Sequence, residues 1–160
     1  MPLRAISSWF LIGTALLPIP ACRPDAPRTR RAMVPLVVLS DTLAICRLEP
    51  GQPMPSWSKP AEGEFASATR TGDELSLIVG DSRAPQGAKC ERGWRVFKVQ
   101  GPLDFSQVGI IAGLSGTLAD SGVSIFALST YDTDYVMVKQ ADFNRAMTAL
   151  RQAGYRVSQP

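Results

Sequence analysis

The stretch GPLDFSQVGIIAGLSGTLADSGVSIFALSTYDTDYVMVK, residues 101–139, decides the fold of this chain. In its first half, apolar residues recur at helical spacing from Ser106 to Ser121, and Gly122 follows as a left-handed helix stop. Two apolar, β-branched runs come next, at Val123–Ser129 and Tyr135–Lys139, with a polar turn between them. The stretch therefore predicts a helix followed by a β-hairpin.

The segments on either side of this stretch complete a repeating pattern of strands and helices. Trp94–Val99 is apolar on both faces, as in a central strand, and Gly101 and Pro102 end it. After the hairpin, apolar residues within 143–153 recur at helical spacing, Gly154 ends that helix, and Tyr155–Val157 is a short strand. The order βαββαβ predicts the α+β class, with a ferredoxin-like antiparallel sheet of four strands and two helices on one face.

The face of this sheet opposite the helices needs a cover. The strands at 123–129 and 135–139 carry apolar residues on both sides. An apolar sheet face is stable only when another layer packs on it. We therefore expect this face to pack either against the first half of the chain or against a second copy.

The first half of the chain reads as short strands with breaks between them. Val34–Leu39 and Leu43–Leu48 form a hairpin or a pair of short strands. The proline-rich residues 50–55 forbid regular pairing. Phe65–Thr71 and Glu74–Val79 alternate apolar and polar residues around Gly-Asp, which predicts a second hairpin.

This second hairpin resembles the one in the second half. Thr69–Leu77 aligns with Thr130–Val138 at a constant offset of 61, which places Asp73 opposite Asp134. The match indicates either a degenerate internal repeat or a chance likeness of two hairpins. We favour the repeat, which divides the chain into residues 1–32, 33–92 and 93–160.

Composition excludes several classes of protein. The chain has a formal net charge of +3, but five arginines and one aspartate lie in residues 1–32, so residues 33–160 are near neutral and no nucleic-acid partner is expected. The absence of histidine removes the commonest general base and most zinc sites. Three distant cysteines indicate neither a metal cage nor a disulfide framework, and Cys46 reads as a buried small hydrophobe. No metal, cofactor or catalytic residue is expected.

The N-terminal residues 1–32 allow two interpretations. The apolar run at 5–21, which ends just before Cys22, resembles a secretory or lipoprotein signal, or an anchor. The alternative, which we favour, is an extension from a mis-assigned start, because a well-patterned region opens at Met33. The expected location is therefore the cytoplasm, and a membrane-anchored or exported protein is the alternative.

The quoted stretch at 101–139 resembles the regulatory ACT domains of aspartate kinases. It looks closest to the bacterial tandem-ACT proteins related to the Castor arginine sensors, as do TRTGDELSLIV at 69–79 and GWRVFKVQGPLDF at 93–105. The resemblance covers about 33–157. It implies an ACT domain at 93–160 behind a degenerate ACT-like domain at 33–92, no catalysis, and an amino-acid effector at a domain interface. The arginine sensors have four such units and this chain has two, so the interface is expected to need a homo-oligomer.

The resemblance also places the ligand-binding residues. Val108, Gly109, Ile110 and Ile111 match the glycine-containing helix start, where free N–H groups and the positive end of the dipole could hold a carboxylate. Thr130, Tyr131 and Asp134 match the positions at which Castor-type sensors contact their ligand, and Asp134 could bind an amine or a guanidinium.

Several of these positions, and the neighbouring Asp104 and Asp132, also have a purely structural interpretation. Asp104 is expected to cap the helix, with Gln107 completing a capping box. Gly109 could serve packing, Asp132 reads as a turn residue, and turn chemistry could account for Asp134. Tyr131 could be a surface aromatic at the tip of the turn.

Two functions remain after this reading. The first is a regulatory module that binds a small molecule, most simply an amino acid, and the second is a ligand-free structural or interaction domain. An enzyme such as an acylphosphatase is disfavoured, because the loop after Val99 has no arginine-bearing, glycine-rich phosphate cradle.

Overall fold

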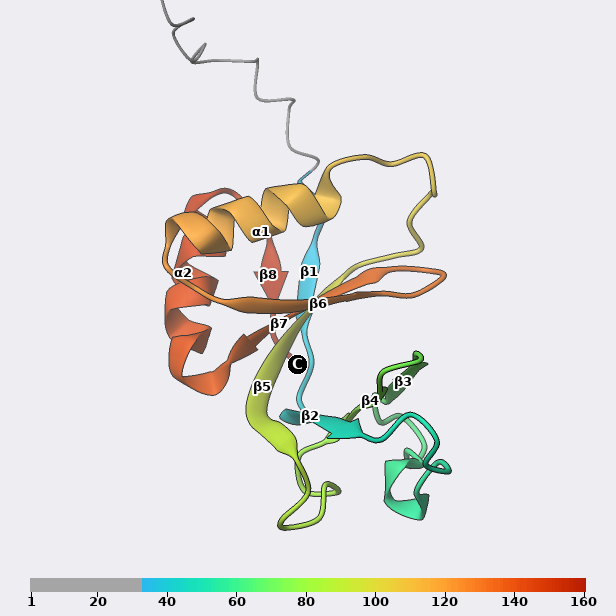
Figure 1. The fold of residues 1–160 in the computed structure, drawn as a ribbon. Coiled ribbons are helices and arrows are strands. Elements are labelled where there is room, and N and C mark those ends of the chain that lie inside the picture. The colour runs from blue at the N-terminus through green and yellow to red at the C-terminus, as the bar shows by residue number, and fades with distance from the viewer. Residues whose placement is uncertain (1–32) are drawn as a thin grey trace, which may run out of the picture.

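The computed structural model describes residues 33–160 of the chain (Figure 1). Residues 1–32, and with them the predictions of a signal, an anchor or a mis-assigned start, lie outside the described residues. The elements, in chain order, are β1 (Leu36–Val38), β2 (Leu43–Leu48), the 3-10 turn η1 (Ser56–Ser58), β3 (Ser67–Arg70), β4 (Leu75–Gly80), β5 (Cys90–Val99), α1 (Ile110–Asp120), β6 (Ile125–Ser129), β7 (Asp134–Lys139), η2 (Gln140–Asp142), α2 (Phe143–Gln152) and β8 (Val157–Ser158).

The long strand β5 joins the two halves of the molecule. Its first residues pair with β2, with Cys46 opposite Cys90, and its later residues pair with β7, with Phe97 opposite Val136. The sheet runs β3-β4-β2-β5-β1-β8, and β7 and β6 extend it from β5. A division at 92/93 falls inside β5, so the three-part division of the chain stays a proposal.

The second half has the predicted βαββαβ order, from β5 to β8, and the α+β class is confirmed. The predicted four-stranded sheet needs one correction. Strand β1 lies between β5 and β8, because Leu36 is opposite Val99 of β5 on one side and Val157 of β8 on the other. The strand fits there because Leu36 and Val38 both point into the core.

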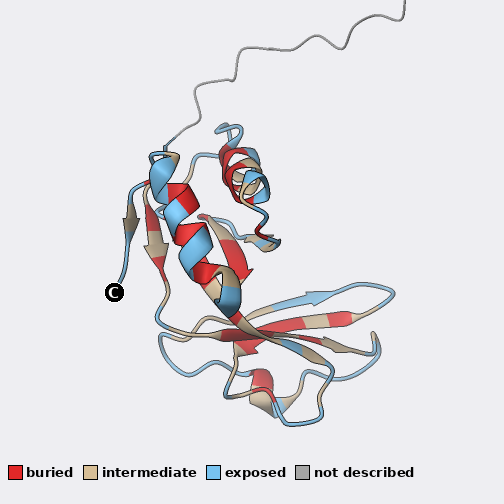
Figure 2. Ribbon diagram, turned by 90° about the vertical axis from the view of Figure 1, so that its left-hand side faces the viewer, coloured by how far each residue is buried: buried red, intermediate tan, exposed pale blue. Residues whose placement is uncertain are grey.

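The two helices cover one face of this part of the sheet. Figure 2 shows buried positions recurring along both helices and along the strands below them. The core between the layers consists of buried apolar residues from β1, β5, α1, β7 and α2 and from the segments just before β6 and β8: Leu36, Val38, Phe97, Val99, Ile110, Leu114, Leu118, Val123, Val136, Val138, Phe143, Ala146, Met147, Leu150 and Tyr155. Within residues 33–160, no helix has the length and apolarity to cross a membrane.

The face opposite the helices packs against the first half of the chain. Val96 and Met137 form a cluster there with Ile78 of β4. Phe65 contacts Tyr135, with 4.8 Å between ring centroids. The sequence allowed two covers for this face, the first half of the chain or a second copy. The structure shows the first half packed there.

The first half departs from the sequence reading in one pairing. Strands β1 and β2 do not pair with each other as a hairpin, because both run antiparallel to β5, one after the other. They are therefore a pair of short strands, the second alternative. The β3–β4 hairpin is confirmed, with Arg70 opposite Leu75.

The two hairpins correspond at a different offset from the one predicted. Thr71 N–H donates to the Glu74 carbonyl at 2.9 Å, and Thr130 N–H donates to the Thr133 carbonyl at 2.8 Å. Because these turns match at an offset of 59 rather than 61, the partner of Asp73 is Asp132 and not Asp134. The repeated aspartate is thus a turn residue, as the sequence reading favoured for Asp132.

The interpretation of the cysteines was wrong in one respect. Cys46 is buried in β2 as expected, but it forms a disulfide with Cys90 across 44 residues of sequence. The sequence predicted a strand only from Trp94 onward, whereas β5 begins at Cys90, which lies opposite Cys46. Antiparallel pairing brings the two side chains to one point, which sequence spacing alone does not show.

Candidate functional site

A hollow of about 360 Å³ lies where the β5–α1 loop, the start of α1 and the β6–β7 turn meet. Six of the seven residues predicted to bind a ligand line it: Gly109, Ile110, Ile111, Thr130, Tyr131 and Asp134. Val108 does not line it, and its side chain is 80% exposed. The structure therefore brings together residues from two segments that lie about twenty positions apart.

Helix α1 forms one wall of the hollow, and it begins at Ile110 rather than at Ser106. Gly109 has a φ of +84°, a left-handed conformation that glycine adopts at little cost, and it marks the boundary. The predicted capping box is wrong, because residues 104–107 form a separate turn. In that turn Gln107 N–H donates to the Asp104 carbonyl and Ser106 N–H donates to the Asp104 carboxylate.

The start of α1 lines the hollow with Ile110 and Ile111. No side chain caps this helix. Among the described residues, Gly113 is the first helix residue whose N–H donates to a carbonyl four residues earlier, that of Gly109, at 2.8 Å. The groups at Ile110 and Ile111 therefore lie at the positive end of the helix dipole and suit an anion.

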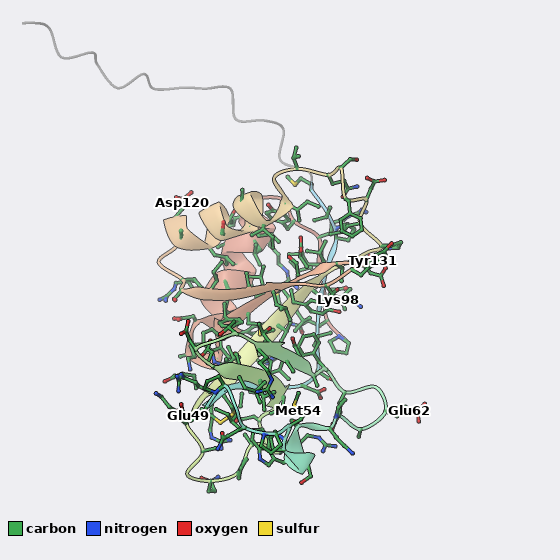
Figure 3. The ribbon with its side chains drawn as sticks, turned by 45° about the vertical axis from the view of Figure 1, so that its right-hand side comes forward. Glu49, Met54, Glu62, Lys98, Asp120 and Tyr131 are labelled. Carbon is green, nitrogen blue, oxygen red and sulfur yellow. A yellow bond between two sulfur atoms is a disulfide. The ribbon has the colours of Figure 1, made fainter. Side chains whose placement is uncertain are left out.

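The β6–β7 turn forms the opposite wall and is tightly bonded. Thr130 Oγ1 donates to the Thr133 carbonyl at 3.0 Å. Thr133 is buried, and its Oγ1 donates to the Val99 carbonyl of β5 at 2.5 Å. Tyr131, labelled in Figure 3, stands at the tip of this turn beside the β5–α1 loop.

A second hydrogen bond braces the two walls against each other. Leu103 N–H donates to the Asp132 carbonyl at 2.8 Å. Gly101 lies so close to this turn that a Cβ on it would meet the same Asp132 carbonyl at 2.6 Å. The hollow is thus bounded by backbone segments in fixed contact, which lowers the entropy cost of binding.

Two carboxylates face the hollow. Asp134 accepts a hydrogen bond from Ser129 Oγ at 2.5 Å through Oδ1. The hydroxyl and N–H of Ser106 hold the pKa of the exposed Asp104 carboxyl below its usual range, so Asp104 is ionised at neutral pH. No lysine or arginine lines the hollow, so its side-chain charge is negative.

The lining residues that the sequence did not assign to ligand binding include Asp104 and Phe105. Asp104 was assigned to helix capping, and Phe105 was not singled out. Phe105 contacts the Tyr131 ring edge-to-face, with 5.2 Å between centroids. The sequence offered one signal for Phe105: it is an aromatic residue in a loop, where no strand or helix of the core would bury it. Within residues 33–160, no cluster of acidic or cysteine side chains is suited to hold a metal ion.

The Thr133→Val variant tests whether the Thr133–Val99 bond holds the turn. Valine keeps the shape of threonine but leaves the buried Val99 carbonyl without its hydroxyl donor, so the unfolding free energy should fall by about 1–3 kcal/mol. Chemical denaturation monitored by tryptophan fluorescence measures this. Thr148→Val is the matched control, since Thr148 is exposed and its hydroxyl bonds within α2, and the stability of this variant should barely change. Equal losses in both variants would contradict a special role for Thr133.

Comparison with known proteins agrees with this geometry. The sequence model of the ACT domain matches residues 89–152, and a model described as an N-terminal domain matches residues 41–87. A crystal structure of a protein from Agobacterium tumefaciens aligns with a TM-score of 0.74 at 32% identity, over 82% of this chain and 96% of that one. The regulatory subunit of aspartate kinase from Thermus flavus aligns with a TM-score of 0.55 at 14% identity, over 77% of this chain and 99% of that one, which is a likeness of fold.

A curated relative carries a functional name. The cytosolic arginine sensor for mTORC1 subunit 1 of Rattus norvegicus is 33% identical over 70 residues, which cover 42% of this chain and 21% of the sensor. The chain thus matches about a fifth of that relative's length.

Residues 89–152 match the ACT domain family, so the chain is an ACT domain protein. Part of the chain is similar in sequence to the cytosolic arginine sensor, and its fold resembles that of the regulatory subunit of aspartate kinase.

Proposed function

We propose that this chain is a regulatory module without catalytic activity, which binds an α-amino acid in the hollow at the start of α1. One observation carries the proposal. Ile110 and Ile111, at the uncapped start of α1, and Asp134, at the start of β7, all line the same hollow. A zwitterion requires a site of this kind, because its carboxylate and its ammonium group need partners of opposite charge at a short separation.

The ACT relatives support a regulatory rather than a catalytic role. One of them is named as an arginine sensor, and another is named as a regulatory subunit. Among the residues that line the hollow, none is a cysteine or a lysine, and the chain has no histidine. The hollow therefore offers hydrogen bonds and two carboxylates, but neither a histidine, the commonest general base, nor a cysteine or lysine nucleophile.

A thermal-shift screen of the proteinogenic amino acids tests the proposal. A ligand that binds the folded state at about 100 times its Kd stabilises it by about 2.7 kcal/mol, so at least one amino acid should raise the Tm by several degrees. The matched control is the corresponding amine without its carboxylate, which should have no effect. If no amino acid shifts the Tm, the alternative of a ligand-free interaction domain is preferred.

Self-association through β6 is the second part of the proposal. Strand β6 pairs only with β7 among the described strands, and its sequence IFALS carries no charge. An uncharged edge without proline or lysine lacks the usual protection against pairing with another strand. A second copy is the simplest partner, because an uncharged edge does not repel itself.

The Ala127→Lys variant tests this interface. Ala127 is exposed on β6, so a lysine there should turn a dimer into a monomer while leaving the fold intact. Sedimentation at tens of micromolar measures the change. Ala68→Lys, on the exposed edge strand β3, is the matched control and should stay dimeric. A wild-type protein that is strictly monomeric would contradict this part of the proposal.

A further inference from the structure

An apolar groove lies beside β3, at the end of the sheet away from the two helices (Figure 1). It has a volume of about 280 Å³ and separates β3 from the proline-rich loop that precedes it. Five apolar residues and one lysine form most of its lining: Met54, Lys59, Pro60, Ala66, Ala68 and Leu77. This β3 groove shares no residue with the hollow at the start of α1.

The walls of the β3 groove are held in place before anything binds. The Arg70 guanidinium donates to the carbonyls of Pro50 and Gln52 and so ties the loop to β3. Within the loop, Ser58 Oγ donates to the Pro55 carbonyl at 2.7 Å. Met54, labelled in Figure 3, nevertheless stays 51% exposed. The groove is thus a formed surface whose apolar lining is open to a partner, and a formed surface costs little entropy to occupy.

Strand β3 offers free backbone groups along its outer edge. Thr71 N–H donates to the Glu74 carbonyl, and in the same register Ala68 lies opposite Leu77. Bonded and non-bonded pairs alternate along an antiparallel ladder, so the N–H and carbonyl of Ala68 point away from β4. Among the described strands, only β4 pairs with β3. The outer edge of β3 can therefore accept a further strand.

A strand added to this edge would place one side chain in the groove. Residues that lie opposite each other in neighbouring strands project to the same face of the sheet. Ala68 lines the groove, and its small side chain leaves room there. The residue opposite Ala68 would therefore project into the space between β3 and the loop. The apolar lining favours a large apolar side chain at that position.

The charge beside the groove is positive. Lys59 is exposed, and it is the charged residue among those that line the groove. Arg70 lies two residues after Ala68 on the same face of β3, and its guanidinium bonds to carbonyls rather than to a carboxylate. Neither cation forms a salt bridge with a described residue. Acidic residues in the added strand complement these charges, whereas β3 of a second copy would bring the same cation and no acid.

We propose that the β3 groove is an interaction surface for an extended, acidic segment of a partner protein. The segment pairs with β3 as an additional strand, inserts one large apolar side chain opposite Ala68, and presents carboxylates to Lys59 and Arg70. Backbone bonds supply affinity in this mode of recognition, and the groove and the two cations supply specificity. The surface is separate from the proposed amino-acid site, so each can be tested without the other.

Selection of phage-displayed random decapeptides on the full chain tests the chemistry of the partner. The selected peptides should carry aspartate or glutamate beside a large apolar residue. Their affinity, measured by fluorescence anisotropy on the synthetic peptides, should fall as salt is raised, because both cations are exposed. Selection of basic or proline-rich peptides, or of none, would overturn the proposal.

A charge reversal at the groove locates the binding surface. Lys59→Glu should weaken the selected acidic peptide by roughly three- to tenfold, because an attraction becomes a repulsion at an exposed position. Lys89→Glu is the matched control, since Lys89 is also exposed but does not line the groove, and the peptide should bind it normally. Equal weakening in both variants would show a general charge effect and would overturn the assignment to the groove.

The backbone pairing has its own test. Ala68→Pro removes the outward N–H at a position where an edge strand tolerates proline, and it should weaken the peptide at least tenfold, whereas Ala68→Ser keeps the N–H and should bind normally. N-methylation of the peptide tests the same pairing on the wild-type chain. Methyl groups at alternate positions should abolish binding and those between them should not, because a strand directs every second N–H to its neighbour. Loss of binding without this alternation would overturn strand addition.

These results are independent of the amino-acid screen. Peptide binding with the expected alternation would support the β3 surface even if no amino acid raised the Tm. An amino acid that raises the Tm, together with the failure of every peptide, would overturn the β3 surface and leave the proposed function intact.

Discussion

The Cys46→Ala/Cys90→Ala double variant should lose about 4 kcal/mol of unfolding free energy. The disulfide joins β2 to the start of β5 across 44 residues of sequence, so it removes much of the conformational freedom of the unfolded chain between them. That segment contains the whole β3–β4 hairpin and the cover of the open sheet face. The loss should therefore appear first as unfolding of the first half.

Guanidinium denaturation of three samples measures this effect. The oxidised wild type should be the most stable, and the double variant and the wild type under a reductant should both be weaker. Cys22→Ser is the control and should match the wild type if Cys22 takes no part. A difference below about 1 kcal/mol between oxidised and reduced wild type would contradict the stabilising role.

The same disulfide bears on the location of the protein. Disulfides persist in oxidising compartments and are rare in the cytosol, where thiols stay reduced. A cytoplasmic location predicts that the two cysteines are largely reduced in the cell. Trapping of free thiols in intact cells measures how much of the pair is reduced. A fully oxidised pair would favour an exported protein.

The Asp134→Asn variant should bind its amino acid about ten to a hundred times more weakly than the wild type. Asparagine keeps the size of aspartate and an oxygen that can accept the Ser129 hydroxyl, but it removes the charge that would pair with the α-ammonium group. The loss of a charge-assisted hydrogen bond corresponds to about 1.5–3 kcal/mol. Calorimetry with the amino acid that scores in the thermal-shift screen measures it.

The stability of this variant provides its internal check. The Tm without ligand should stay within a few degrees of the wild type, because Asp134 is only half-buried and the substitution is nearly isosteric. Asp132→Asn removes an equal charge from the same turn outside the hollow and should bind normally. Equal affinities for Asp134→Asn and wild type would remove Asp134 from the site.

The fold of the second half could be predicted because its signals are local. Helical periodicity, the stops at Gly122 and Gly154, and the alternation in β6 and β7 each depend on neighbouring residues. Both glycines adopt the left-handed conformation expected of them. The sequence placed the start of α1 at Ser106, four residues before its true start at Ile110. The apolar pattern runs through Gly109, so the pattern alone does not show that the helix begins only after this residue.

The candidate site could be predicted in part. The resemblance to ACT domains identified Gly109–Ile111 and Asp134, and the structure brings them to one hollow. Phe105 and Asp104 could not be found in this way, because their role depends on the β5–α1 loop folding back onto the β6–β7 turn. That approach is created by the bonds from Leu103 to Asp132 and from Thr133 to Val99.

The sequence by itself determined the order of strands and helices and the α+β class, which follow from periodicity, and its resemblance to ACT domains indicated the ACT relationship. Only the tertiary structure decided three features: the insertion of β1 between β5 and β8, the disulfide between Cys46 and Cys90, and the ring contact between Phe105 and Tyr131. Each joins residues far apart in the chain. Their meeting depends on strand register and loop path, which many sequence positions set jointly and no local pattern displays.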